Sequence, residues 1–574
     1  MAWRTCVLLL CVTAVLADGD WLEVDLEQGP VRGQKHPGGD LYAFYNIPYA
    51  TGPSGEDKFK APLPPPTWTE PFNATLEKIV ICPQHDSMPE LLVEQQEDCL
   101  IANVFVPDTT EKDLSVLVYV HGGGFVAGFS TLFQGTQFIR EKKDFIMVTF
   151  NYRLGIHGFL CLGTEDVPGN AGMKDQVELL RWVQKNIASF GGNPNDVTLV
   201  GSSAGSASVE LLMLSKSAEN LFHRVIPESG GSLAAFAVQR DPLEIAKTYA
   251  KKINAHAMVD DMFFLERFYK TTSIDALTAE SFFDRTDSTF LFSPCVERNR
   301  NGAFLTESPL TILKSGDYKK VPMLYGFANM EGLLRINFFE TWKNKMNEKF
   351  SDFLPADLQF QSDTERLQVA NTVKQFYFGN DPVSNENILK YVDFFSDVII
   401  TFPMLWASKL LVEAGHNQIY LYEYSFVDEN TVPVPHTEDV RGAEHCAQTF
   451  AWLDPMEPLL ETPQFQKMRA TVREIWHNFM KTGTPVPEVL EGSSLLEWPA
   501  LGVGRSPHMV LNETLELQGV LLPERQRFWE DIYEKHYLDS VPPRSGAGSI
   551  VQKNMFTLLT LYVLFYFTKN IIVD

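Results

Sequence analysis

The chain has 574 residues, of which 45% are hydrophobic and 21% are charged, and its formal net charge is -25. This composition excludes a disordered or fibrous chain and allows a large buried core. The excess of acidic residues repels phosphate backbones, so we expect no nucleic-acid partner. Because no linker or internal repeat interrupts residues 24–535, we predict one folded domain over residues 18–540.

The first 17 residues, MAWRTCVLLLCVTAVLA, have the pattern of a secretory signal peptide. A short basic start precedes an apolar run, and Val15 and Ala17 supply the small residues of a cleavage site. We therefore predict a secreted protein in an oxidising compartment, where disulfides form. Asn73 and Asn512 each begin an Asn-X-Thr sequon, which predicts a glycoprotein.

Removal of the signal peptide leaves an odd number of cysteines, so they cannot all pair within the chain. The nearest pair is Cys82 and Cys99, and a disulfide that closes a loop of this size stabilises by about 3 kcal/mol. The remaining cysteines are Cys82, Cys99, Cys161, Cys295 and Cys446.

A strand pattern over residues 117–120 ends in His121-Gly122-Gly123-Gly124. Glycine exposes backbone N–H groups, as an oxyanion hole requires, and each such donor is worth about 3 kcal/mol in a transition state. The run lacks the lysine of a phosphate-binding loop, which argues against that alternative. We expect Gly123 and Gly124 to donate, with Ala204 as a third donor.

The strongest local signal is a β-branched run over residues 197–200, followed by Gly201-Ser202-Ser203-Ala204-Gly205 and a helix-compatible stretch. This strand–turn–helix arrangement is typical of a nucleophile elbow, which projects a serine from a strained turn. Glycines on both sides of the serine let the strand and the helix approach closely. We predict that Ser203 is the nucleophile.

A serine nucleophile needs a base and an orienting acid, which follow it along the chain in the order acid, then histidine. Glu331 comes just after a strand pattern at residues 321–326, where α/β sheets hold their sites. His445 lies in the loop after a second strand pattern, at residues 419–424, and is the predicted base; His436 in the same loop is the alternative. Phe290 or Phe292 is a candidate for the acyl-binding side, or an ordinary core residue.

The C-terminus combines a spacer at residues 541–554 with an apolar tail at residues 555–574. The apolar stretch from Met555 to Phe567 is too short to cross a bilayer core, which needs about 20 residues. Small residues, a spacer and an apolar tail fit a lipid-anchor signal, although the charged Lys569 and Asp574 depart from it. Membrane anchoring through the C-terminus and a plain secreted protein are the two alternatives.

Over residues 24–537 the chain resembles the type-B carboxylesterase and cholinesterase family. The resemblance implies an α/β-hydrolase fold, with a large, mostly parallel central sheet flanked by helices. It also implies a triad of Ser203, Glu331 and His445 and a disulfide between Cys82 and Cys99. The motifs that carry it, besides the glycine run and the elbow, are EDCL (97–100), NYRLG (151–155), NAGMKDQ (170–176), WVQKNIASFGGNP (182–194), LFHR (221–224) and NFMKTGTP (478–485).

Three departures from the family pattern bear on function. Ser202 replaces the glutamate that usually precedes the nucleophile, and the loop between Cys82 and Cys99 lacks the tryptophan with which cholinesterases hold a quaternary ammonium. Residues 254–294 contain no cysteine, so the family's second disulfide is expected to be missing. The chain looks most similar to insect-type esterases that act on hydrophobic neutral esters, such as xenobiotics, pheromones or hormones.

We therefore predict a carboxylesterase that forms an acyl-enzyme on a small-molecule ester. No cysteine–histidine cluster has metal-ligand spacing, so we expect no metal and no other cofactor. One alternative is a catalytically inactive cell-surface adhesion protein of the same fold, but such proteins lose triad members, and all three are present here. A lipase acting at an oil interface is a further alternative, and the oligomeric state is left open.

Overall fold

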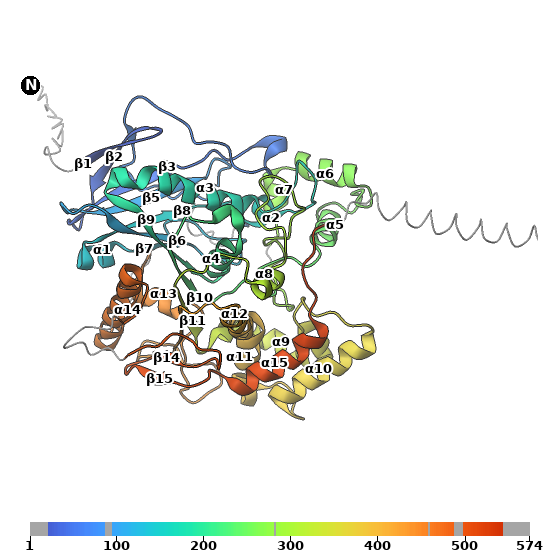
Figure 1. The fold of residues 1–574 in the computed structure, drawn as a ribbon. Helices are drawn as coiled ribbons and strands as arrows, with labels where there is room; N and C mark the ends of the chain where they lie inside the picture. The colour runs from blue at the N-terminus through green and yellow to red at the C-terminus, as the bar shows by residue number, and fades with distance from the viewer. Residues whose placement is uncertain (1–20, 86–94, 281–282, 457–459, 487–496, 544–574) are drawn as a thin grey trace, which may run out of the picture.

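The computed structural model describes residues 21–85, 95–280, 283–456, 460–486 and 497–543 (Figure 1). The predicted signal peptide, the apolar tail and all but three residues of the spacer lie outside these ranges.

A central sheet runs through the molecule (Figure 1). Within the described ranges it has 13 strands, in the order β1-β2-β3-β5-β8-β6-β9-β10-β11-β12-β14-β15, with β4 paired to β2. From β8 to β14 all neighbours are parallel. The strands are β1 Trp21–Leu26, β2 Gly29–Lys35, β3 Leu41–Pro48, β4 Phe72–Asn73, β5 Ile101–Pro107, β6 Leu114–Val120, β8 Phe145–Phe150, β9 Gly192–Ser202, β10 Arg224–Glu228, β11 Met323–Ala328, β12 Ile419–Tyr424, β14 His508–Leu511 and β15 Glu516–Gln518, and β7 Phe133–Gln134 pairs with β13 Asp454–Pro455 apart from this sheet.

Helices cover both faces of the sheet (Figure 1). Because both faces are buried, the sequences of its central strands are continuous apolar runs. In β6, Val116 and Val118 pack into one core with α3 and α4, whereas Leu117 and Tyr119 pack into the opposite core with α1 and α14. The helices are α1 Thr136–Lys142, α2 Gly155–Phe159, α3 Ala171–Asn186, α4 Ala204–Leu214, α5 Pro242–Ile253, α6 Met262–Thr271, α7 Ile274–Thr278, α8 Pro309–Ser315, α9 Phe339–Lys349, α10 Asp363–Phe378, α11 Ile388–Ser396, α12 Phe402–Glu413, α13 Ala447–Trp452, α14 Pro463–Thr482 and α15 Pro523–His536.

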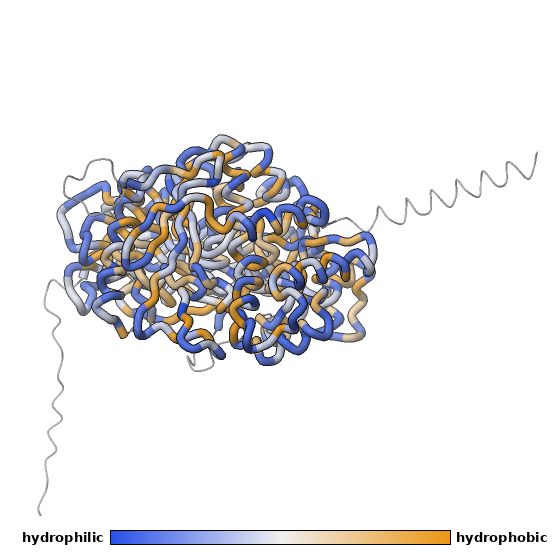
Figure 2. The backbone as a smooth tube through the Cα atoms, turned by 90° about the horizontal axis from the view of Figure 1, so that it is seen from below, coloured by the Kyte–Doolittle hydropathy of each residue, from blue (hydrophilic) through white to orange (hydrophobic). Residues whose placement is uncertain are grey.

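Hydrophilic segments occupy much of the outer rim of the molecule (Figure 2). Among the described residues, one helical run, Asn385–Glu413, is long and apolar enough to cross a membrane by length and composition, but 83% of its apolar window is buried inside the protein. Because the protein itself covers this run, it is a core helix of the fold.

The parallel strands deliver the predicted site residues to one edge of the sheet. Ser203 follows β9, Glu331 follows β11, and the loop that carries His445 follows β12. The glycine run begins directly after β6, which pairs in parallel with β9. The carboxyl ends of neighbouring parallel strands meet at the same edge, which is where open α/β sheets hold their sites.

Candidate active site

Ser203 occupies a sharp turn between β9 and α4. Its backbone has φ 57° and ψ -121°, a conformation that is strained for a residue with a side chain and that projects it from the turn. A Cβ added at Gly201 would lie 2.3 Å from the carbonyl oxygen of Gly205, and one at Gly205 would lie 2.1 Å from that of Val120. Only glycine fits at these two positions, as an elbow requires.

The glycine run after β6 lies against this elbow. A Cβ added at Gly122 would lie 3.0 Å from the Cβ of Ser203, so the two loops are in close contact. Gly123 and Gly124 have φ 112° and 63°, which turns their backbone away from a strand. In the part of the chain that the structure describes, the N–H groups of Gly123, Gly124 and Ala204 donate no hydrogen bond to protein. These donors therefore remain available for an oxyanion.

Glu331 and His445 are hydrogen-bonded to each other. Nδ1 of His445 lies 2.5 Å from Oε2 of Glu331, whose side chain is fully buried. The other carboxylate oxygen accepts from the backbone N–H of Ala328 at 2.8 Å and from Oγ of Ser229 at 2.5 Å. Gln448 in turn donates to Oγ of Ser229 at 2.7 Å. This network fixes the carboxylate and orients the imidazole.

The charge beside His445 shifts its titration. Burial on its own lowers the pKa of His445, but its buried neighbours Cys446 and Glu331 raise it, and the net pKa lies well above 6.5. Burial raises the pKa of the Cys446 thiol, so we assign the upward shift of the His445 pKa to the Glu331 carboxylate. A carboxylate in this position stabilises the imidazolium that forms when the histidine takes a proton.

The end of β10 links the nucleophile to the acid. The carbonyl oxygen of Glu228 accepts from the N–H of Ser203 at 2.8 Å, and the next residue, Ser229, donates to Glu331. Within the described residues no hydrogen bond joins Oγ of Ser203 to His445. Such a contact often forms only when substrate is bound.

The alternative base, His436, lies elsewhere. Its Nε2 is 2.8 Å from Oε1 of Glu340, and both side chains are at least one-third exposed. Its Nδ1 contacts Asn385. The structure thus brings His445, not His436, to the predicted acid.

Ser202, where the family usually has a glutamate, pairs in register with Glu228 on the neighbouring strand β10. Ser202, which stands in that position, is buried and hydrogen-bonded to the hydroxyl of Tyr119 at 2.8 Å. A fully buried carboxylate lies nearby at Glu228, where it accepts from the indole N–H of Trp452 at 3.0 Å and of Trp476 at 2.7 Å. Burial raises the pKa of Glu228 to about 7, against the opposing effect of its donors.

Sequence reasoning missed Glu228, Ser229 and Gln448. One signal that could have found the first two is their place at the carboxyl end of β10, beside the elbow strand. Gln448 follows the predicted base by three residues and gives no comparable signal.

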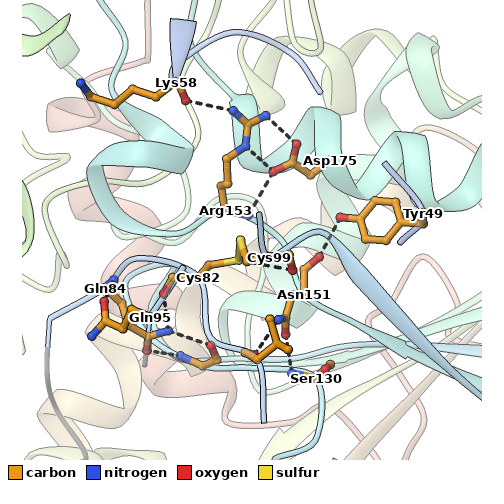
Figure 3. The surroundings of a disulfide bond; sticks show 12 residues. Tyr49, Lys58, Cys82, Gln84, Gln95, Cys99, Ser130, Asn151, Arg153 and Asp175 are labelled. Atoms are coloured by element: carbon orange, nitrogen blue, oxygen red, sulfur yellow. Dashed lines mark hydrogen bonds and ion pairs between the residues drawn. A yellow bond between two sulfur atoms is a disulfide. The ribbon is translucent and has the colours of Figure 1, made fainter. Parts of the chain in front are cut away.

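The disulfide between Cys82 and Cys99 is present, as the resemblance implies (Figure 3). Gln84, two residues after Cys82, donates to the carbonyl of Gly128 at 3.0 Å and accepts from its N–H at 2.9 Å. Since Gly128 packs against the ring of His121, this loop supports the base of the glycine run. A buried ion pair between Arg153 and Asp175, 2.6 Å long, lies on the far side of the disulfide (Figure 3).

A second disulfide joins Cys161 to Cys295, a pairing that the sequence analysis did not predict. The two cysteines are 134 residues apart, so their spacing did not suggest the bond. A Cβ added at Gly169 would lie within 2.7 Å of both sulfurs, so glycine leaves room for them. Among the described residues, the one free cysteine is the buried Cys446.

The two candidate phenylalanines occupy different surroundings. The ring of Phe290 would lie 3.0 Å from a Cβ at Gly124, so it borders the glycine run. Phe292 stacks edge-on against Tyr249, at 5.2 Å between ring centroids. Phe290 is therefore the candidate for the acyl-binding side.

The two predicted glycosylation sites are at least partly exposed to solvent. Asn73 is exposed and Asn512 is half-buried, so glycosylation of both stays a prediction that their surroundings allow. Within the described ranges, no group of three or more His, Cys, Asp or Glu side chains is placed to hold a metal ion.

The chain matches known proteins over most of its length. The model of the Carboxylesterase family matches residues 20–529. Esterase B1 of Culex pipiens is 35% identical over 493 residues, covering 81% of this chain and 89% of the relative. Juvenile hormone esterase of Heliothis virescens is 31% identical over 532 residues, covering 83% and 87%.

A solved structure confirms the α/β-hydrolase fold. The crystal structure of juvenile hormone esterase from Manduca sexta, with OTFP covalently attached, superposes with a TM-score of 0.78 at 28% identity, covering 90% of this chain and 100% of the other. The chain belongs to the carboxylesterase family and is a carboxylic ester hydrolase.

Proposed function

We propose that the chain hydrolyses esters through an acyl-enzyme on Ser203. The observation that carries the proposal is the pair of His445 and Glu331, hydrogen-bonded at 2.5 Å at the sheet edge where Ser203 occupies a strained elbow. In the first step Oγ of Ser203 attacks the ester carbonyl, and Nε2 of His445 takes its proton and passes it to the departing alcohol. Water, deprotonated by the same nitrogen, then cleaves the acyl-enzyme and regenerates the serine.

The developing oxyanion is the second element of the mechanism. We assign the stabilisation of this oxyanion to the N–H groups of Gly123, Gly124 and Ala204, which have no protein acceptor among the described residues. Donors of this kind act where charge develops, and the loss of one typically costs about 3 kcal/mol of transition-state stabilisation.

We propose hydrophobic neutral esters as substrates. The loop between Cys82 and Cys99 contains no tryptophan to hold a quaternary ammonium. Phe290 gives the site an apolar wall next to Gly124. Two relatives are named juvenile hormone esterases, which fits an ester of hormone type, and the xenobiotic and pheromone classes fit the same apolar wall.

We propose a secreted protein, made with the signal peptide at residues 1–17 and glycosylated at Asn73 and Asn512. As the alternative to a plain secreted protein, we propose that residues 555–574 are a signal for lipid anchoring at the cell surface. The two disulfides are consistent with an oxidising compartment.

The base assignment is tested by comparing His445→Ala with His436→Ala at equal folded concentration. We expect the first variant to lose several orders of magnitude in kcat and the second to stay within a few-fold of wild type, because His436 pairs with Glu340 at the surface. If His436→Ala is the costly change, the triad is wrong. If the purified wild-type protein itself shows no ester hydrolysis, the inactive adhesion alternative gains the stronger case.

A further inference from the structure

Arg335 is a buried cation close to the proposed acid. It lies in the 3₁₀ helix Glu331–Phe338, four residues after Glu331, and its side chain is only 2% exposed. Its Nη1 donates to the carbonyl oxygen of Phe283. Within the ranges that the structure describes, its Nε and Nη2 are buried without any hydrogen-bond partner.

Other buried arginines of the chain are paired with carboxylates. Arg153 lies 2.6 Å from Asp175, and Arg473 lies 3.0 Å from Asp454. Asp284 and Asp287 are near enough to Arg335 to act on its charge, but Asp287 pairs instead with Arg285. A buried charge with unused donors is costly, which marks Arg335 as different from these structural pairs.

Aromatic rings surround the guanidinium. Its Cζ lies 5.0 Å from the ring centroid of Phe290, 5.7 Å from that of Trp342 and 6.0 Å from that of Phe338. Cation–π attraction of this kind favours the charged form but satisfies no N–H group. Burial lowers the pKa of Arg335 to about 10, so it remains charged at neutral pH.

Phe290 connects this cation to the reaction site. The same ring that lies under the guanidinium borders Gly124, one of the proposed oxyanion donors. In the proposed mechanism the acyl carbon of a bound ester lies beside Ser203 and these donors, which puts the Phe290 ring next to the start of the acyl chain. The guanidinium of Arg335, with its unused N–H groups, lies against this same ring.

We infer that Arg335 determines specificity for the acyl part of the ester, by donating hydrogen bonds from Nε and Nη2 to an oxygen acceptor on the acyl chain. The inference rests on the proposed acyl-enzyme function and narrows its substrate class. The preferred ester carries a keto or carboxylate oxygen several carbons from the ester carbonyl, on a chain that is otherwise hydrocarbon. A planar guanidinium with two unused donors suits either acceptor.

The test compares three esters of one alcohol: 4-nitrophenyl hexanoate, 4-nitrophenyl 5-oxohexanoate and the 4-nitrophenyl monoester of adipic acid. For the full-length protein we expect kcat/KM of at least one oxygen-bearing ester to exceed that of the hexanoate by at least about tenfold, the value of one hydrogen bond to a charged group. A preference for the 5-oxo ester identifies a neutral acceptor, and a preference for the monoester identifies a carboxylate.

Arg335→Met should reduce this ratio to about one, and Arg335→Lys, which keeps the cation but loses the planar fork, should leave an intermediate ratio. Lys343→Met is the matched control, because Lys343 lies over the ring of Phe339 at 5.2 Å but pairs with Glu340, and it should leave the ratio unchanged. The inference is overturned if the wild-type ratios are near one, or if the preference survives in folded Arg335→Met. Hydrolysis of the hexanoate without any preference would overturn it and leave the proposed function intact, whereas no hydrolysis of any of the esters would count against the proposed function itself.

Discussion

Two buried glutamates lie at the carboxyl ends of neighbouring parallel strands, and their hydrogen-bond partners differ. Glu228 ends β10 and Glu331 follows β11, and each accepts three hydrogen bonds from side chains or backbone. Glu331 faces the titratable ring of His445, whereas Glu228 faces two tryptophans and a threonine, none of which carries charge. The comparison indicates that burial alone does not assign a carboxylate to catalysis; in the proposed mechanism Glu331 is distinguished by a partner that must be oriented and charged during turnover.

The largest expected effect separates these two acids by rate. Glu331→Gln should lower kcat by about 10⁴, because the amide stabilises the wrong imidazole tautomer and no imidazolium. Glu228→Gln is the matched control and should stay within about tenfold of wild type, since its side chain contacts indoles and not the base. Steady-state kinetics with one ester suffices, and equal losses in the two variants would contradict the division of roles.

A second difference concerns stability and its dependence on pH. The pKa of Glu228 rises from 4.5 to about 7 on folding, so the folded state binds the proton more tightly than the unfolded state. The stabilisation that this tighter proton binding gives the folded state is therefore complete below pH 4.5 and is lost as pH rises through about 7, a change of about 3 kcal/mol.

Glu228→Gln removes this titration. The free energy of unfolding of the variant minus that of wild type should be about 3 kcal/mol larger at pH 8 than at pH 4.5. Urea unfolding of both proteins at the two pH values measures this difference. A difference between the two proteins that is the same at both pH values would show that Glu228 ionises alike in the folded and unfolded states.

The smallest effect tests whether either acid attracts a cationic substrate. Both carboxylates are occupied by buried donors, and no tryptophan stands between Cys82 and Cys99. We expect butyrylcholine and its uncharged 3,3-dimethylbutyl analogue to have similar kcat/KM. A cation–π contact of about 2 kcal/mol corresponds to about thirtyfold, so a larger preference for choline would place an anion or aromatic ring in the substrate pocket.

The parts of the site that local chemistry dictates were predictable from sequence. The elbow around Ser203 and the glycine run after β6 each need glycine at fixed offsets from one serine or one strand, and such offsets are visible in a single segment. The order of acid and histidine, with strand patterns before each, was enough to select Glu331, but it left His436 open beside His445.

The rest depended on contacts between distant segments. The pairing of Cys161 with Cys295 depends on the fold that brings residues 134 positions apart together. Ser229 and Gln448 are ordinary polar residues in sequence, and only their meeting at Glu331 gives them a role. Arg335 was not singled out from the sequence, because its contacts with the rings of Phe290 and Trp342 depend on the fold.

The central claim is that Ser203 carries the acyl group during turnover. The most direct measurement is intact-protein and peptide mass spectrometry after reaction with a fluorophosphonate, for wild type and Ser203→Ala at equal folded concentration. We predict one equivalent of label, on the peptide that contains Ser203, with complete loss of labelling and ester turnover in the variant and nearly unchanged thermal unfolding, since the change removes one partly exposed hydroxyl. Label on another residue, or turnover that persists in Ser203→Ala, would contradict the claim.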